Sequence, residues 1–170
     1  DTAAQSILMT DDAAFASAVE EAVTRQLKTL SRGNIAGESW SVFGATIILR
    51  SLDEAPALAD RLAAEHLEIA TENAEELSDA IRNAGAIFLG SQTPEAIGDY
   101  VSGSNHVLPT ARSARFSSGL GVLDYMKRTS ILKLNAASLA ALAKPAMTLA
   151  RAEGLEAHRR SVEIRLGSEG

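Results

Sequence analysis

The 170-residue sequence contains no cysteine, and this absence excludes several kinds of site at once. It rules out a disulfide framework, thiolate metal ligands and a cysteine nucleophile. A metal ion would have to be held by His, Asp, Glu or Gln side chains, and the chain has only three histidines. The lack of cysteine also suits a cytoplasmic protein.

The sequence also lacks a long apolar run and an excess of positive charge. No apolar run approaches the roughly 18 residues that a membrane span needs, so we expect no membrane partner. The formal net charge is −6 and no basic run stands out, which argues against a nucleic-acid partner. The HExxH and GxSxG motifs are absent, as is a GxGxxG after a strand. The GxG within residues 117–125 therefore does not predict a dinucleotide site.

Short apolar segments alternate with segments of helical periodicity. The apolar segments predict strands at residues 6–10, 45–50, 67–70 and 86–89. Caps, spacing and stop signals predict helices from Asp11 or Asp12 to Leu30 with Gly33 as the stop, over 52–64 with Pro56 in the first turn, and from Asn73 to Gly85. This alternation is typical of a mostly parallel sheet with crossover helices, so the predicted class is α/β.

The second half of the chain loses this alternation. Residues 90–130 are irregular and rich in Gly, Pro and Ser, and such a long stretch inside a domain is usually either functional or disordered. From residue 135 onward the pattern is helical, with an expected kink near Pro145 and a break at Gly154. We therefore expect two parts, an α/β portion over residues 1–130 and a helical C-terminal tail over 131–170.

The three histidines and their acidic neighbours are the candidate functional residues. Asp99 and His106 lie in GDYVSGSNHVLPT. They could bind a metal or transfer a proton, or they could belong to a loop whose polar groups satisfy its own backbone. The adjacent Glu65 and His66 are expected at the end of a helix, as an acid–base pair or as a solvated helix end. His158 by itself is typical of an exposed helical histidine. The residues alone leave these alternatives open.

Four motifs occur in order along nearly the whole chain: AEHLEIAT (64–71), PEAIGDYVSGSNHVLPT (94–110), SGLGVLDYMKRTS (118–130) and AEGLEAH (152–158). Together they resemble the C-terminal portion of histidinol dehydrogenase, a zinc- and NAD-dependent homodimeric enzyme of histidine biosynthesis. The family oxidises L-histidinol to L-histidine through histidinaldehyde, a four-electron oxidation that uses two NAD. The resemblance implies an incomplete Rossmann-like parallel sheet and a helical tail that is swapped onto the partner subunit.

The resemblance also implies a role for each of seven residues. Asp99 and His158 would be zinc ligands that also contact the substrate, with His158 reaching in from the partner subunit. Glu65 and His66 would be the acid–base pair, in which Glu65 helps to activate water and His66 is the main proton shuttle. The remaining substrate-binding residues would be His106, Glu95 and, from the partner subunit, Glu153.

The resemblance leaves part of the family's site outside this sequence. Two further zinc ligands of the family, a Gln and a His, would lie immediately upstream of Asp1, so the chain supplies two of the four expected ligands. Two ligands hold zinc far more weakly than four. We therefore expect the chain alone to bind zinc poorly and to be inactive. The sequence does not locate the residues that contact NAD.

Two other functions remain open from the sequence. A related zinc- and NAD-dependent enzyme would oxidise another small alcohol, such as a sulfonated diol, but Glu95 and Glu153 favour a cationic substrate over an anionic one. Alternatively, the chain would be a structural or dimerising module without enzyme activity. The zinc content of purified material, with and without the upstream segment, separates this module from an enzyme.

Overall fold

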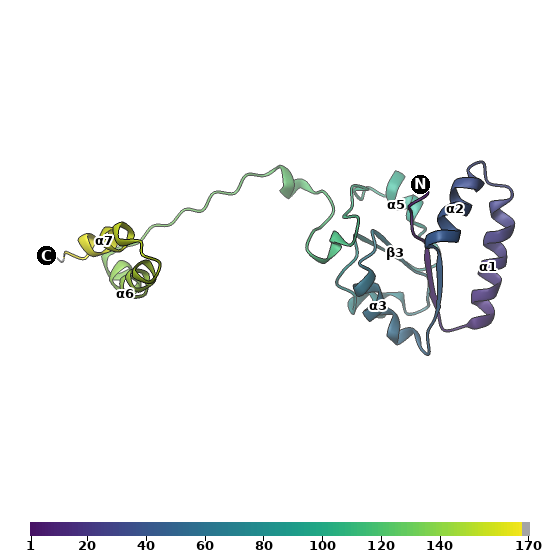
Figure 1. Ribbon diagram of the computed structural model, residues 1–170, viewed down its shortest axis with the longest axis horizontal. Helices are drawn as coiled ribbons and strands as arrows, with labels where there is room; N and C mark the ends of the chain where they lie inside the picture. Colours follow the sequence, from purple (N-terminus) through teal and green to yellow (C-terminus); the bar gives the residue numbers. More distant parts are fainter. Residues whose placement is uncertain (168–170) are drawn as a thin grey trace. The chain divides into compact units, whose positions relative to one another are not determined.

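The computed structural model describes residues 1–167 and divides the chain into two compact units, Asp1–Tyr125 and Met126–Gly170 (Figure 1). The first unit contains the strands and the second contains two helices. Among the described residues, no helix is both long and apolar enough to cross a bilayer.

The strands of the first unit form two parallel pairs. β1 (Ile7–Thr10) pairs with β2 (Ala45–Ile48), and β3 (His66–Ile69) pairs with β4 (Ala86–Leu89). All four predicted strands are present, with bounds that agree to within two residues. The α/β class with parallel strands is therefore confirmed. Within residues 1–167, however, hydrogen bonds join the strands into two separate two-stranded sheets rather than one.

The first predicted helix ends earlier than expected, and a second helix follows it. α1 (Ala13–Leu27) begins after Asp12, whose side chain accepts hydrogen bonds from two backbone N–H groups of the first turn. Gly33 does not simply stop this helix, as predicted, but starts α2 (Gly33–Phe43). A Cβ at Gly33 would overlap the carbonyl oxygen of Leu27, so glycine permits the tight turn between the two helices. Glycine reads as a stop signal in the sequence, which is why the prediction missed α2.

The predicted helix over 52–64 is shorter and is split in two. A single 3₁₀ turn, η1 (Leu52–Glu54), precedes α3 (Ala55–Leu62), and Pro56 lies in the first turn as predicted. The placement of Glu65 and His66 at a helix end is therefore wrong, since α3 stops at Leu62 and His66 is the first residue of β3. Ala63 adopts a left-handed conformation with φ of 50°, which ends the helix and turns the chain toward the strand.

The two faces of the β3–β4 pair have different environments. α4 (Ala74–Asp79) covers one face, where Ile69, Ala74 and Leu77 form a buried cluster with partly buried Leu67, Ile81 and Leu89 packed against it. α4 ends before the predicted Gly85 because the chain enters an irregular segment after Asp79. Side chains alternate between the faces of a strand, so His66 and Glu68 point away from this cluster.

α5 (Glu95–Tyr100) lies against the other face of the β3–β4 pair. Gly98 is buried there, and a Cβ on it would overlap the ring of Phe88 on β4. The short helix therefore approaches the strands closely enough for its side chains to reach residues of β3. Beyond α5 the first unit is largely irregular, as predicted, with single turns at η2 (Ser113–Arg115) and η3 (Val122–Tyr125).

The second unit is a pair of packed helices. α6 (Ala136–Ala152) begins at Asn135, whose side chain caps it, and contains Pro145 without an interruption of the helix. α7 (Glu156–Arg165) follows the predicted break at Gly154, which has φ of 72°. This positive φ is a conformation that favours glycine, and it reverses the chain so that the two helices pack on each other.

Candidate functional site

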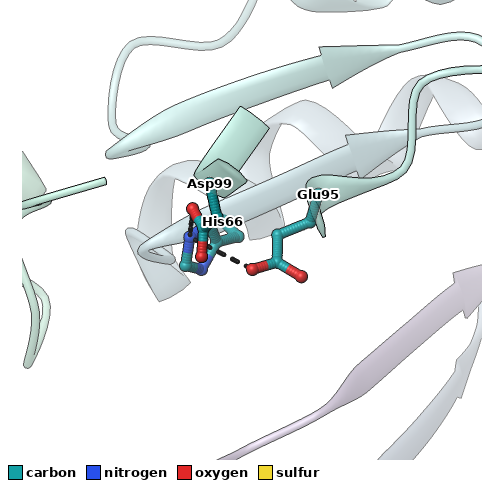
Figure 2. A group of neighbouring side chains, drawn as sticks. All are labelled: His66, Glu95 and Asp99. Carbon is teal, nitrogen blue, oxygen red and sulfur yellow. Dashed lines mark ion pairs between the residues drawn. The ribbon is translucent and has the colours of Figure 1, made fainter. Parts of the chain in front are cut away.

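The imidazole of His66 faces two carboxylates from α5 (Figure 2). Its Nε2 atom lies 3.5 Å from Oδ1 of Asp99 and 3.7 Å from Oε1 of Glu95. This nitrogen is buried and makes no hydrogen bond in the structure. Both distances are too long for a strong hydrogen bond, so the atom is left without a full partner in the protein.

The spacing of the two acidic residues explains why both reach His66. Glu95 and Asp99 are four residues apart on α5, and this spacing places side chains on the same side of a helix. One ligand atom from each of His66, Glu95 and Asp99 lies within 4.8 Å of the others. An imidazole nitrogen and two carboxylate oxygens are suitable ligands for zinc. The donor set therefore fits a divalent cation.

The local electrostatics also favour a cation at this position. Burial raises the pKa of the Glu95 carboxyl, and the neighbouring carboxyls of Asp99 and Glu68 raise it further, whereas His66 lowers it. Two neighbouring carboxylates repel each other when both are ionised. A metal ion, a protonated imidazole or a substrate amine would relieve this repulsion. The site is thus built to receive positive charge.

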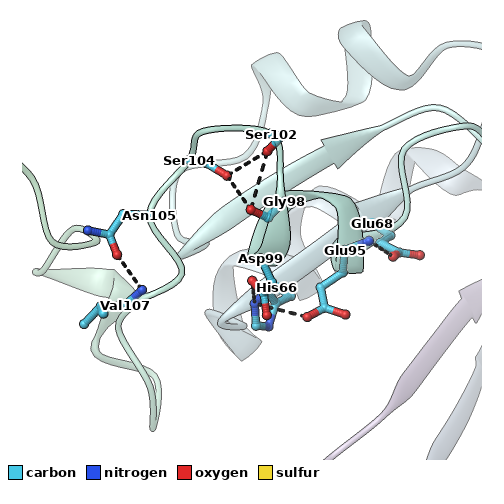
Figure 3. Close-up of polar contacts among 9 residues, drawn as sticks. All are labelled: His66, Glu68, Glu95, Gly98, Asp99, Ser102, Ser104, Asn105 and Val107. Carbon is cyan, nitrogen blue, oxygen red and sulfur yellow. Dashed lines mark hydrogen bonds and ion pairs between the residues drawn. The ribbon is translucent and has the colours of Figure 1, made fainter.

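The loop after α5 carries His106. Oδ1 of Asn105 accepts a hydrogen bond of 2.7 Å from the backbone N–H of Val107, which forms a turn around His106 (Figure 3). The His106 side chain is exposed and is not part of the three-residue cluster. The loop satisfies part of its own backbone, as one of the two alternatives predicted. A substrate-binding role for His106 stays a prediction.

The other predicted site residues lie outside the cluster. Glu65 directly precedes His66, and its carbonyl accepts a hydrogen bond of 2.9 Å from the N–H of Ala86. Glu153 ends α6 and His158 lies on α7, both exposed and both in the second unit. The resemblance implies Asp99 and His158 as metal ligands, and the structure groups Asp99 with His66 and Glu95.

The comparison with known proteins identifies the family. Residues 1–166 match the profile of the family described as histidinol dehydrogenase. A histidinol dehydrogenase from Rhizobium meliloti (strain 1021) is 64% identical over 172 residues, which cover 100% of this chain and 40% of that protein. One from Brucella suis biovar 1 (strain 1330) is 66% identical over 166 residues, which cover 98% of this chain and 39% of that protein.

A solved structure gives the same result for the fold. The crystal structure of histidinol dehydrogenase from Elizabethkingia anophelis superposes with a TM-score of 0.83 at 35% identity and covers 96% of this chain and 38% of that one. The chain thus spans about 40% of the length of the relatives that it matches. The family predicted from the four motifs is confirmed: this chain belongs to the histidinol dehydrogenase family.

Proposed function

We propose that this chain supplies part of the active site of an enzyme that oxidises L-histidinol to L-histidine through histidinaldehyde. One observation carries the proposal: in a chain of this family, the buried Nε2 of His66 faces Glu95 and Asp99 without a hydrogen-bond partner. A partly buried imidazole beside two carboxylates, with no hydrogen bond that fixes its Nε2, is suited to exchange a proton with a substrate hydroxyl.

The two carboxylates support His66 as the proton shuttle. A proton accepted at Nε2 makes the imidazole cationic, and the charges of Glu95 and Asp99 stabilise that form. Glu65, which directly precedes His66, is proposed to activate the water that enters when the aldehyde is oxidised. The same base then acts in both oxidations, because the hydrated aldehyde again presents a hydroxyl group to it.

The acidic character of the site supports a cationic substrate. Glu95 is proposed to bind the amino or imidazole end of histidinol, together with His106 and with Glu153 from the second unit of a partner subunit. A sulfonated diol would bring an anion toward two neighbouring carboxylates, Glu95 and Asp99, which repel it. The charge of the site therefore favours histidinol over this alternative.

The ligands that this chain offers are suitable for zinc. They do not indicate where NAD binds. Asp99 and His158 are proposed to hold zinc with ligands from outside this sequence. When bound, zinc would supply Lewis-acid polarisation of the substrate hydroxyl. Within residues 1–167, no glycine-rich turn between a strand and a helix offers a dinucleotide cradle. We therefore assign no NAD contact to the described residues.

The assembly and location follow from the same proposal. Glu153 and His158 belong to the second unit, and we propose that this unit is exchanged between two subunits of a cytoplasmic homodimer, so that each site is completed by the partner. A chain that holds only two of four zinc ligands is expected to be inactive by itself.

The proposal is tested with a fusion enzyme in which this chain replaces the matching 40% of the Rhizobium meliloti relative. Histidinol-dependent reduction of NAD is measured for the fusion, for its His66→Asn variant and for the 170-residue chain alone. We expect turnover by the fusion, a loss of at least about 100-fold in the variant, and none by the chain alone. Glu76→Gln, at an exposed position on α4, is the control and should keep full activity. A fusion that turns over equally well without His66 contradicts the proposal.

A further inference from the structure

The carboxylate of Glu68 contacts the start of the helix that carries Glu95 and Asp99. Its Oε1 atom accepts a hydrogen bond of 2.7 Å from the backbone N–H of Glu95 (Figure 3). Glu68 lies two residues after His66 on β3, so both side chains project from the same face of the strand. Neither the motifs nor the acid–base scheme gives Glu68 a role.

α5 needs an acceptor at this end because its own sequence does not supply one. The N-cap residue is Pro94, whose side chain makes no capping hydrogen bond. The first N–H groups of a helix have no partner inside the helix and are usually satisfied by the N-cap side chain. Glu68 supplies this acceptor from 27 residues earlier in the chain. The start of α5 is therefore tied to the strand that carries His66.

Two further contacts fix the remainder of the short helix. Gly98 lies against the Phe88 ring with no room for a Cβ. Hydroxyl groups of Ser102 and Ser104 donate hydrogen bonds of 3.5 and 3.1 Å to the carbonyl of Gly98 (Figure 3). The close contact at Gly98 sets the distance between helix and strand, and the two serines hold the C-terminal end of the helix. The Glu68 carboxylate contacts the backbone of Glu95, a residue whose side chain faces His66.

We propose that Glu68 is a positioning residue, whose carboxylate fixes the first turn of α5 so that Glu95 and Asp99 face His66. The inference rests on the proposed function, since it assigns the orientation of that same site. Glu68 is not in the group of ligand atoms formed by His66, Glu95 and Asp99. Its negative charge helps to raise the pKa of Glu95, and we assign the positioning to its hydrogen bond with the Glu95 backbone.

Two substitutions of Glu68 in the fusion enzyme separate the hydrogen bond from the charge. Glu68→Gln keeps an oxygen that accepts from the N–H of Glu95, whereas Glu68→Ala removes it. Misplacement of catalytic groups by about 1 Å can cost up to roughly 100-fold in rate. We expect kcat to fall at least about tenfold in the Ala variant, and to stay within about threefold of the parent in the Gln variant. Glu76→Ala, on α4, is the matched control and should leave kcat unchanged.

Hydrogen–deuterium exchange of residues 94–102 gives a readout that does not need turnover. We expect faster exchange in the Ala variant and parental exchange in the Gln and control variants. If the unmodified fusion fails to oxidise histidinol, the proposed function fails, and the exchange data still decide the role of Glu68. Equal exchange in all variants overturns the positioning role. So does a Gln variant as impaired as the Ala variant, because the charge would then be what matters.

Discussion

At the scale of single residues, the site carries two carboxylates against one imidazole. One ligand atom from each of His66, Glu95 and Asp99 lies within 4.8 Å of the others. The Nε2 atom of His66 makes no hydrogen bond. Such an arrangement is not optimal for folding, because half-buried acidic groups repel each other. It is favourable once a cation is present. A raised pKa at a partly buried group with a charged neighbour is also typical of functional sites.

The raised pKa of Glu95 predicts how stability depends on pH. Below the pKa of the unfolded chain the carboxyl is protonated in both states. As pH rises through the higher pKa of the folded state, ionisation in the site lowers stability. Glu95→Gln should therefore stabilise the metal-free fusion at pH 7 and not at pH 4. The gain should stay below about 1 kcal/mol, because the side chain is 40% exposed.

Thermal unfolding of parent and variant at the two pH values measures this difference. Glu76→Gln, at an exposed position on α4, serves as the control and should not give the stabilisation at pH 7 that is expected of Glu95→Gln. A gain for Glu95→Gln that is larger at pH 4 than at pH 7 has the wrong sign and contradicts the assignment.

The proposed role of Asp99 as a zinc ligand predicts that its substitution weakens zinc binding. Asp99→Asn removes an anionic ligand and should lower the zinc affinity of the fusion enzyme at least about tenfold, measured by competition with a chelator. The control is Asp79→Asn at the exposed end of α4, which should bind zinc like the parent. Unchanged zinc affinity in Asp99→Asn would remove this residue from the metal site.

At the scale of elements, replacing a glycine by alanine should change the stability of the protein in opposite directions in two helices. A Cβ at Gly98 overlaps the buried ring of Phe88, whereas one at Gly37 on α2 meets only the Leu27 side chain at 3.9 Å. Gly98→Ala should destabilise by about 1–3 kcal/mol through overpacking. Gly37→Ala should stabilise by up to about 1 kcal/mol, because alanine loses less backbone freedom in a helix. Denaturant unfolding of the fusion measures both, and equal effects would contradict the packing of α5 on β4.

The elements also show which parts of the fold can be read from local sequence. The strands were predicted because each is a short apolar run between polar turns, and α1 because Asp12 caps a regular apolar spacing. α2 was missed because Gly33 is both a turn residue and the start of a helix. The expected helix end at Glu65 was wrong because Ala63 adopts a left-handed conformation that no local pattern indicates.

The site needed information that the local pattern does not contain. The i,i+4 spacing of Glu95 and Asp99 is visible in the sequence once a helix is assumed. Their contact with His66 joins segments about 30 residues apart, and it depends on the close packing of Gly98 on Phe88. The motifs named the residues, but only the fold brings three of them together. Glu68 could have been found from strand alternation, because it follows His66 by two positions.

At the scale of the whole molecule, large apolar side chains remain exposed in both units. Phe116, Ile131 and Leu132 are 85%, 91% and 83% exposed, and no large side chain among the described residues is fully buried. Apolar surface of this kind is usually covered by a partner surface. The chain alone should therefore bind the dye ANS strongly, and the fusion enzyme weakly at equal subunit concentration. Equally weak binding by both would show that these side chains are covered within the chain itself.

We propose that His66 and Asp99 act together at one zinc-dependent site for histidinol. The most direct test of this proposal is a crystal structure of the fusion enzyme with zinc and histidinol, with anomalous diffraction at the zinc edge. We predict an anomalous peak at bonding distance from an Asp99 oxygen, about 2.0–2.2 Å, with the histidinol hydroxyl within hydrogen-bond reach of His66 Nε2. A peak bound elsewhere, with Asp99 and His66 free of both zinc and substrate, would contradict the account.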